Sequence, residues 1–355
     1  MADWRKIPEA GTVFAIRMLV LLARTFGRRV AGWFLYVVAL YYAIVRGGAR
    51  RSSRDYLRRV GHRATFANVV RHLHTFAQVS LDRLFFLTGQ WDSFRFEHRN
   101  HESLVQVAKT GRGVLLLGAH LGSFEVMRCR AKQFGVPINV VADFSNAERV
   151  NGVLRSLAPD LDTRLISLGT DPVGAVLEIR AAIDRGELVA ILGDRPPSSK
   201  VGKTGHTRIV MSQFLGAAAA FPAGPWLLAH SLGCPVYFVA GVYTRPNHYA
   251  LHFELLADEV RLDRHEREAA LARYAQAYAS MLETYARSAP LNWFNFFDFW
   301  SQPEPAPGTA APRAGGGGGS ASWRASSRGP WSRTSRTVSA KRVSGRGRCS
   351  GRRAP

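Results

Sequence analysis

The sequence predicts an α/β protein with a mostly parallel central sheet and flanking helices. Four short apolar runs, at residues 113–118, 137–143, 163–168 and 188–194, have the composition of strands that are buried on both faces. The segments between these runs carry apolar residues at helical spacing. Strands that alternate with helices of this kind are typical of βαβ units, in which the strands run parallel.

The connecting helices and the last elements of the domain follow from the same patterns. We expect helices at 124–134, 146–157 and 171–186. The third has clear boundaries, because Asp171 and Pro172 form a helix start and Gly186 a helix stop. Residues 235–243 and 249–256 indicate two paired strands, and 263–287 an amphipathic helix. We also expect a helix from Phe214 to Pro225, with small residues on one face that leave room for a neighbouring backbone or a slender acyl chain. Tight packing of the helix on the sheet is the alternative.

The formal charge of +22 is concentrated at the two ends of the chain. Residues 1–75 carry fourteen Lys and Arg against three acids, and residues 301–355 carry eleven against one. The part between them is nearly neutral and lacks the basic stripe of a nucleic-acid-binding domain, so we expect no nucleic-acid partner there. The sequence therefore divides into a basic helical segment (1–75), an α/β domain (76–300) and a tail (301–355).

The N-terminal segment has the composition of a membrane-associated region. Two apolar runs, 13–23 and 31–45, are followed by a series of arginines from Arg46 to Arg59. Aromatic and aliphatic side chains beside clustered arginines suit the headgroup region of an anionic leaflet, and the arginines favour its cytoplasmic side. Shallow insertion and one short span both fit. A buried helical hairpin of a soluble protein is the alternative.

The tail from 301 to 355 is rich in Gly, Ser, Pro and Arg and nearly free of aliphatic residues. Such a segment cannot bury enough apolar surface to fold, and we expect it to be disordered. A basic arm that touches lipid or nucleic acid and an extension without a role both remain open. The three cysteines stand at unrelated spacings, which argues against a disulfide framework or a zinc site.

His120 ends the first apolar run, and Glu125 follows five residues later. Chance alone would produce about one such spacing in a chain of this composition. The position of His120 at the end of a predicted strand is what makes it a candidate functional residue. Chemistry in open α/β sheets collects beyond the carboxyl ends of strands. Gly118 and Gly122 allow a tight turn around the histidine. The alternative is a polar residue that ends a strand and is satisfied by a nearby acid.

An imidazole held by an acid at one nitrogen can take a proton from a hydroxyl with the other. We therefore expect His120 to be a general base and Glu125 to orient it. No nucleophilic serine on a G-x-S-x-G turn accompanies the pair. The residues thus indicate direct attack by a substrate hydroxyl on an activated acyl group.

A second strand end carries Asp194 and Arg195, followed by two prolines. We expect these side chains to hold polar groups of a substrate, and a salt bridge within a turn is the alternative. The GKT that comes next lacks the first glycine of a phosphate-binding loop, so we predict no nucleotide site.

Four segments in order, "GAHLGSFE", "AILGDRPP", "FLGAAAAFPAGPWLLAHSLGCPVYFVAG" and "PLNWFNFFDFW", carry a family resemblance. Together with the N-terminal segment they resemble the bacterial lipid A biosynthesis (lauroyl/myristoyl) acyltransferase family, within the lysophospholipid acyltransferase superfamily, over residues 1 to 300. Two departures from the family pattern bear on which acceptor the protein uses. "GDRPP" stands where these enzymes often have D-x-D-x-G, and the basic residues that follow the terminal Trp in the family are missing directly after Trp300.

The resemblance implies transfer of a fatty acyl chain from acyl-carrier protein or acyl-CoA to a hydroxyl of a lipid A precursor or related glycolipid. It places the protein at the cytoplasmic face of the bacterial inner membrane, with no metal or other cofactor. His120 matches the catalytic base, Glu125 its partner and Asp194 a functional aspartate. Arg155 and Arg164 both fall where the family has a further arginine. An acyl-thioester hydrolase and a non-enzymatic basic membrane- or nucleic-acid-binding protein are the rival functions.

Overall fold

The computed structural model describes residues 21–23, 25–87, 89–127, 137–142, 164–167, 171–195 and 208–300. The described helices are α2 (Gly27–Val45), α3 (Gly47–Arg59), α4 (Phe66–Leu87), α5 (Glu102–Lys109), α8 (Pro172–Asp184), α9 (Gly224–Leu232) and α10 (Arg267–Ser288). The described strands are β1 (Arg95–Arg99), β2 (Val114–Gly118), β3 (Ile138–Ala142), β4 (Arg164–Ser167), β5 (Leu188–Leu192), β6 (Ile209–Phe214), β7 (Ala217–Pro222), β8 (Val236–Arg245) and β9 (His248–Ala257). The expected run at 13–20, most of the helix at 124–134, all of that at 146–157 and the tail lie outside the described residues.

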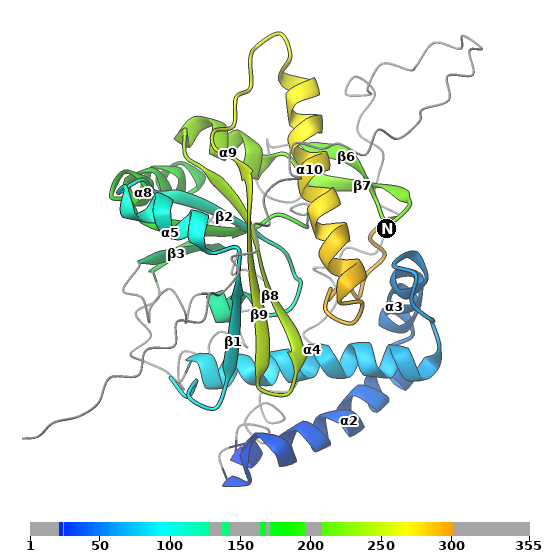
Figure 1. The fold of residues 1–355 in the computed structure, drawn as a ribbon. Helices are drawn as coiled ribbons and strands as arrows, with labels where there is room; N and C mark the ends of the chain where they lie inside the picture. The colour runs from blue at the N-terminus through cyan, green and yellow to red at the C-terminus, as the bar shows by residue number, and fades with distance from the viewer. Residues whose placement is uncertain are drawn as a thin grey trace, which may run out of the picture. The chain divides into compact units, whose positions relative to one another are not determined.

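Seven strands form one sheet in the order β1-β9-β8-β2-β5-β3-β4 (Figure 1). All neighbouring strands are parallel except β8 and β9, which form an antiparallel pair. The sheet is flanked by helices, so the expected α/β fold with a mostly parallel sheet is confirmed. All five residues of β2 are buried, as a continuous apolar run in a doubly covered strand requires.

Helices cover both faces of the sheet. Leu115 and Leu117 of β2 pack in the core formed with α8, α9 and α10. Leu116 points to the opposite face and packs in the core formed with α5 and the second half of α4. This alternation along β2 is the two-residue period of a strand, and it places both cores against the same central strand.

The helix expected at 171–186 is confirmed with its caps. The Asp171 side chain accepts a hydrogen bond from the backbone N of Gly174 at 2.9 Å, and Pro172 occupies the first turn. Gly186 has a φ of +77°, a backbone conformation that glycine adopts without strain, and it follows the end of the helix.

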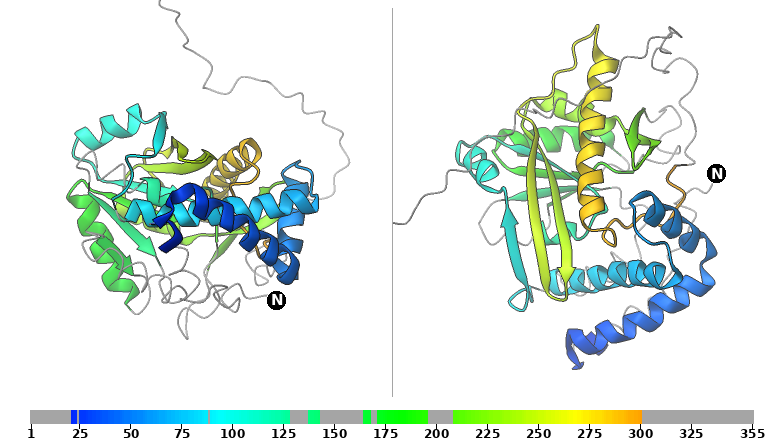
Figure 2. Two further views of the ribbon diagram at one scale, coloured as in Figure 1. Left: turned by 90° about the horizontal axis from the view of Figure 1, so that it is seen from below. Right: turned by 45° about the vertical axis from the view of Figure 1, so that its right-hand side comes forward.

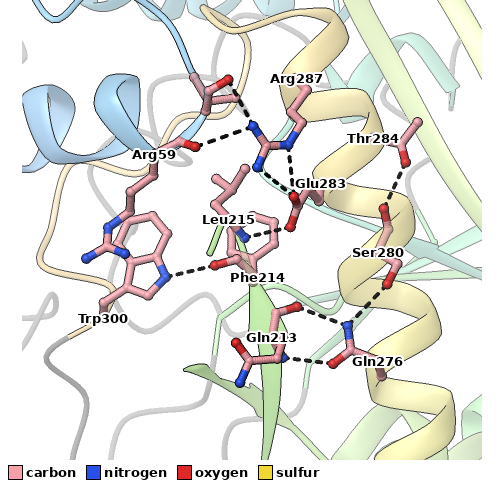
Figure 3. A network of polar contacts seen from close by, with 11 residues as sticks. Arg59, Gln213, Phe214, Leu215, Gln276, Ser280, Glu283, Thr284, Arg287 and Trp300 are labelled. Carbon is pink, nitrogen blue, oxygen red and sulfur yellow. Dashed lines mark hydrogen bonds and ion pairs between the residues drawn. The ribbon is translucent and has the colours of Figure 1, made fainter. Parts of the chain in front are cut away.

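The segment from Phe214 to Pro225 is not one helix, and that expectation was wrong. It forms the end of β6, all of β7 and the first two residues of α9, and the two strands pair as an antiparallel hairpin. The two residues of the turn, Leu215 and Gly216, have φ values of +50° and +81°, as a type I′ hairpin turn requires. Figure 3 shows the hairpin fastened to α10, where the Gln276 side chain bonds both the backbone N and the backbone O of Gln213.

The N-terminal helices form a layer at one end of the sheet. Both Figure 1 and the right view of Figure 2 place α2 on the side of α4 that faces away from the strands. Arg28 of α2 is bonded to buried Asp82 of α4 at 2.7 Å, and the same carboxylate accepts the Tyr249 hydroxyl of β9 at 2.7 Å. The boundary that we expected between residues 75 and 76 therefore falls inside α4, a helix that also packs on the sheet.

Candidate active site

The carboxyl ends of β2 and β5 lie side by side, because Gly118 is in register with Leu192. His120 and Asp194 each follow their strand by two residues. The two side chains therefore meet although they are 74 residues apart in the sequence, and Nδ1 of His120 lies 2.8 Å from Oδ1 of Asp194. The sequence placed both residues at strand ends but did not pair them.

Close contact between backbones fixes the turn that carries His120. Gly122 has a φ of +65°, and a Cβ there would lie 2.0 Å from the carbonyl oxygen of Gly241. The Ser123 backbone N donates to that same oxygen at 2.7 Å. Only glycine fits at residue 122, so the glycine that the sequence singled out serves a close backbone approach to β8.

Asp194 is buried and accepts several hydrogen bonds. Its Oδ2 accepts from the backbone N of His120 and from Nε1 of Trp293, both at 3.0 Å. Burial alone would raise the pKa of this carboxyl. The His120 imidazole and Arg195 outweigh burial and lower the pKa of Asp194 to about 2. Asp194 is thus a carboxylate at neutral pH.

The carboxylate determines the tautomer of His120. Because a carboxylate only accepts hydrogen bonds, Nδ1 carries the proton and Nε2 carries the lone pair. The His120 side chain keeps 30% of its exposure. Burial and the Arg195 charge lower its pKa, and Asp194 acts in the opposite direction. A neutral imidazole with a basic Nε2 is the state that a general base needs.

Arg195 lies beside the pair and is held by the last aromatic segment. Its Nη2 donates to the carbonyl oxygen of Phe294 at 2.9 Å, and its Cζ lies 5.5 Å from the centre of the Phe297 ring. Burial lowers the pKa of this guanidinium, while Asp194 opposes that shift. It brings a positive charge close enough to His120 to disfavour the imidazolium.

Glu125, the acid that we expected to orient His120, has a different described partner. Its Oε1 lies 2.8 Å from Nε of Arg83, which belongs to α4. The Nδ1 contact that orients the imidazole belongs to Asp194 instead. Physically, the strand-end position of Asp194 directs its carboxylate at His120, whereas the residues after Gly122 turn back into a helix. The five-residue spacing therefore paired His120 with an acid other than the one that contacts it in the structure.

Of the two candidate arginines, Arg164 is placed by the register of its strand. Arg164 begins β4, at the amino end of a strand that is parallel to β3. The register places its backbone level with Leu115, five residues before His120, which corresponds to about 16 Å along a strand. Arg155 lies outside the described residues.

Sequence reasoning missed the residues that surround Asp194 from other elements. The indole of Trp293 reaches its Oδ2, and Tyr278 of α10 donates its hydroxyl to the Gly118 carbonyl oxygen at 2.8 Å. The Asn292 side chain bonds both backbone groups of Tyr243 at 2.8 and 3.0 Å. Asn292 and Asn295, two of the three polar residues in the run "PLNWFNFFDFW", were the available signal, because buried polar groups need partners.

Within the described ranges, no group of three or more His, Cys, Asp or Glu side chains could hold a metal ion. Neither the protein-family models nor the curated proteins compared with this sequence gave a match. The site is a neutral histidine whose Nδ1 is bonded to a buried carboxylate, next to a cation, at the carboxyl edge of a parallel sheet.

Proposed function

We propose that this protein is a membrane-associated O-acyltransferase. It transfers a fatty acyl chain from acyl-carrier protein or acyl-CoA to a hydroxyl of a lipid A precursor or a related glycolipid, at the cytoplasmic face of a bacterial inner membrane. The observation that carries the proposal is the 2.8 Å contact between Nδ1 of His120 and Asp194, which prepares Nε2 as a base. The ordered motifs that resemble the acyltransferase family support the choice of reaction.

The proposed reaction needs one base and no covalent enzyme intermediate. Nε2 of His120 removes the proton of the acceptor hydroxyl while its oxygen attacks the thioester carbonyl carbon. The carbon–oxygen bond forms and the carbon–sulfur bond breaks. The leaving thiolate takes the proton back from the imidazolium, and an ester and a free thiol are the products. Asp194 stabilises the imidazolium while it exists, as carboxylates do in hydrolase triads.

Arg195 is assigned to polar groups of the donor or the acceptor. Its charge is held by Phe294 and Phe297, so it does not depend on the substrate for its position. A fixed cation beside the base favours negative charge that develops on the thioester oxygen.

The outer face of α2 supports the membrane part of the proposal. Trp33, Val37, Tyr41 and Ile44 recur at helical spacing and are 58–78% exposed. By length and composition α2 is the one described helix that could cross a membrane. Its other face packs on α4 through Ala31, Leu35, Ala39 and Ala43, so we propose that α2 lies along the membrane surface.

Charged side chains next to α2 fit an anionic leaflet. Arg51 and Arg58 of α3 are exposed, and Arg50 caps α2 by donating to the carbonyl oxygen of Ala43 at 2.9 Å. Basic residues beside an apolar face add about 1 kcal/mol each near anionic lipid.

Mass spectrometry of lipids tests the function. We expect cells without the protein to lose one acylated lipid, which returns with the wild-type gene and not with His120→Ala. Full rescue by His120→Ala would contradict the catalytic assignment. With the purified full chain and acyl-CoA alone, steady release of free thiol at the rate seen with acceptor would favour the hydrolase instead.

A further inference from the structure

We propose that Trp293 is a positioning residue of the His120–Asp194 pair, and that His72 on α4 fixes Trp293 in turn. The effect of Trp293 on catalysis rests on the proposed function, whereas its contacts with Asp194 and His72 do not. In the proposed reaction Trp293 contacts neither the substrate nor Nε2 of His120. It acts through Asp194.

The first step is the indole hydrogen bond. Asp194 Oδ1 is occupied by His120 Nδ1, and Oδ2 receives the Trp293 indole N–H at 3.0 Å. The indole is 1% exposed, so water does not compete for this contact. An N–H donated to one oxygen fixes the carboxylate plane and draws negative charge away from the oxygen that faces the imidazole.

The backbone around Trp293 is joined to the backbone around His120. Leu121 and Trp293 form an antiparallel bridge, and the Phe294 backbone N donates to the His120 carbonyl oxygen at 2.8 Å. The Gly122 backbone N donates to the Asn292 carbonyl oxygen at the same distance. The indole and the imidazole are therefore carried by two segments that are locked together.

The second step runs from Trp293 to α4. Nε2 of His72 lies 3.0 Å from the Trp293 carbonyl oxygen, and Nδ1 lies 2.9 Å from the Ser53 hydroxyl of α3. A carbonyl only accepts, so Nε2 carries the proton and the hydroxyl donates to Nδ1. Burial lowers the pKa of His72 to about 4, against a smaller opposing effect of that carbonyl, so the ring is neutral.

Aromatic packing holds the indole from several sides. The rings of Tyr56, Phe214 and Phe299 meet it edge to face with centroids 5.0–5.2 Å away. Trp293 is thus fixed at its carbonyl oxygen, at its N–H and on its ring.

The charged groups around His120 and Asp194 define what a change at Trp293 would do. Arg195 faces both residues from the end of β5, and the Tyr278 phenol of α10 lies near Asp194. Glu125, five residues after His120, is paired with Arg83 of α4. With these unchanged, removing the indole N–H leaves more negative charge facing the imidazole and stabilises the imidazolium.

The experiment is an NMR titration of the His120 imidazole in the full chain, wild type against Trp293→Phe. We expect the His120 midpoint to move to higher pH in the variant, and kcat/KM to fall about tenfold to a hundredfold. Trp300→Phe is the matched control, because its indole donates to the Phe214 carbonyl oxygen at 3.3 Å and not to Asp194 (Figure 3). We expect this control to leave the His120 midpoint unchanged.

A second measurement does not require the variant to fold. In wild-type protein labelled with ¹⁵N-tryptophan, the Trp293 indole signal should titrate with the same midpoint as His120. The proposal would be overturned if the Trp293 indole signal did not change as His120 titrates. Equal His120 midpoints in wild type and a folded Trp293→Phe variant would also overturn it. His72→Gln, which can keep a donor toward the Trp293 carbonyl, should retain more activity than His72→Leu.

Failure of this inference and failure of the proposed function give different results. If the wild type transfers no acyl group, the proposed function fails, while the two NMR titrations still report whether Trp293 and His120 are coupled. If acyl transfer proceeds but the titrations are independent, only the role of Trp293 fails.

Discussion

The region around His120 and the outer face of α2 are opposite arrangements of polarity. Near His120, charged and polar side chains are buried, and Asp194 is 1% exposed. On α2, apolar side chains are open to solvent, with Trp33 78% exposed. The buried polar groups have partners at 2.8–3.0 Å, whereas the outer apolar side chains of α2 stay 58–78% exposed.

The two regions therefore differ in what they require from outside the protein. Buried polar groups with all their partners inside the protein are set in advance, which is how a catalytic base is kept in one tautomer and orientation. An exposed apolar face is incomplete until something covers it. We therefore expect changes near His120 to alter rate and acid stability, and changes on α2 to alter binding to lipid alone.

The largest expected effect distinguishes the two acids near His120. Asp194→Asn replaces a carboxylate, which only accepts hydrogen bonds, by an amide that also donates them. An amide N–H₂ facing Nδ1 of His120 would favour the tautomer with the proton on Nε2, and Nε2 would then no longer be basic. We expect kcat/KM to fall by about 10²–10⁴. Glu125→Gln, a matched loss of charge on the Arg83 side, should lower it by less than about tenfold. Steady-state kinetics with one acyl thioester measures both.

A larger loss for Glu125→Gln than for Asp194→Asn would restore the assignment that the five-residue spacing suggested. It would mean that the carboxylate bonded to Nδ1 in this structure is not the one that acts during the reaction.

The second effect concerns acid stability through buried His72. Its pKa is lowered from 6.5 to about 4, so the unfolded chain binds more protons between these values. The stability that neutral His72 contributes is complete above pH 6.5 and is lost as pH falls toward 4. From pH 7 to 4.5 we expect the wild type to lose about 2 kcal/mol more unfolding free energy than His72→Gln.

Urea denaturation of both proteins at the two pH values measures this difference. Asp194 does not interfere, because its lowered pKa affects stability only below about pH 3.8. His120 is present in both proteins and cancels. Equal losses in the wild type and His72→Gln would show that His72 is not held neutral.

Local patterns predicted the parts of the fold that depend on neighbouring residues. The four parallel strands were predicted from apolar runs, and α8 from its helical pattern and the cap formed by Asp171. All of these signals lie within short stretches of consecutive residues. The positions of His120 and Asp194 were predicted for the same reason, since each follows the end of a strand. The hairpin of β6 and β7 was missed because alanine-rich composition concealed the positive φ values at Leu215 and Gly216.

The pairing of the site could not be predicted, because it depends on strand order. Nothing in the sequence states that β5 lies next to β2 while β3 lies beyond it. The strand order brings Asp194 to His120 although the two residues are 74 positions apart in the sequence. Trp293, which also contacts Asp194, is a further 99 positions along the chain. Glu125 was the nearest acid in the sequence, and sequence distance favoured it over the acid that the sheet brings into contact.

The smallest expected effect tests the other side of the comparison. Val37 on α2 is 64% exposed, and Val173 on α8 is 71% exposed. If α2 lies on a bilayer, Val37→Ser removes apolar area that the lipid would cover, at about 1 kcal/mol, or roughly a fivefold weaker partition into vesicles containing phosphatidylglycerol. Val173→Ser makes the same chemical change on another helix and should leave the partition unchanged. Sedimentation with vesicles measures both.

The outcome matters because it separates two meanings of an exposed apolar helix. Equal weakening by the two substitutions would show that exposed valines act in the same way wherever they lie, and the role of α2 as the lipid-facing surface would fail. A loss confined to Val37→Ser, with kcat toward a soluble acyl thioester unchanged, would show that the lipid-binding face and the base at His120 are energetically separate. Membrane binding would then set where His120 meets its acceptor and leave its chemistry to Asp194.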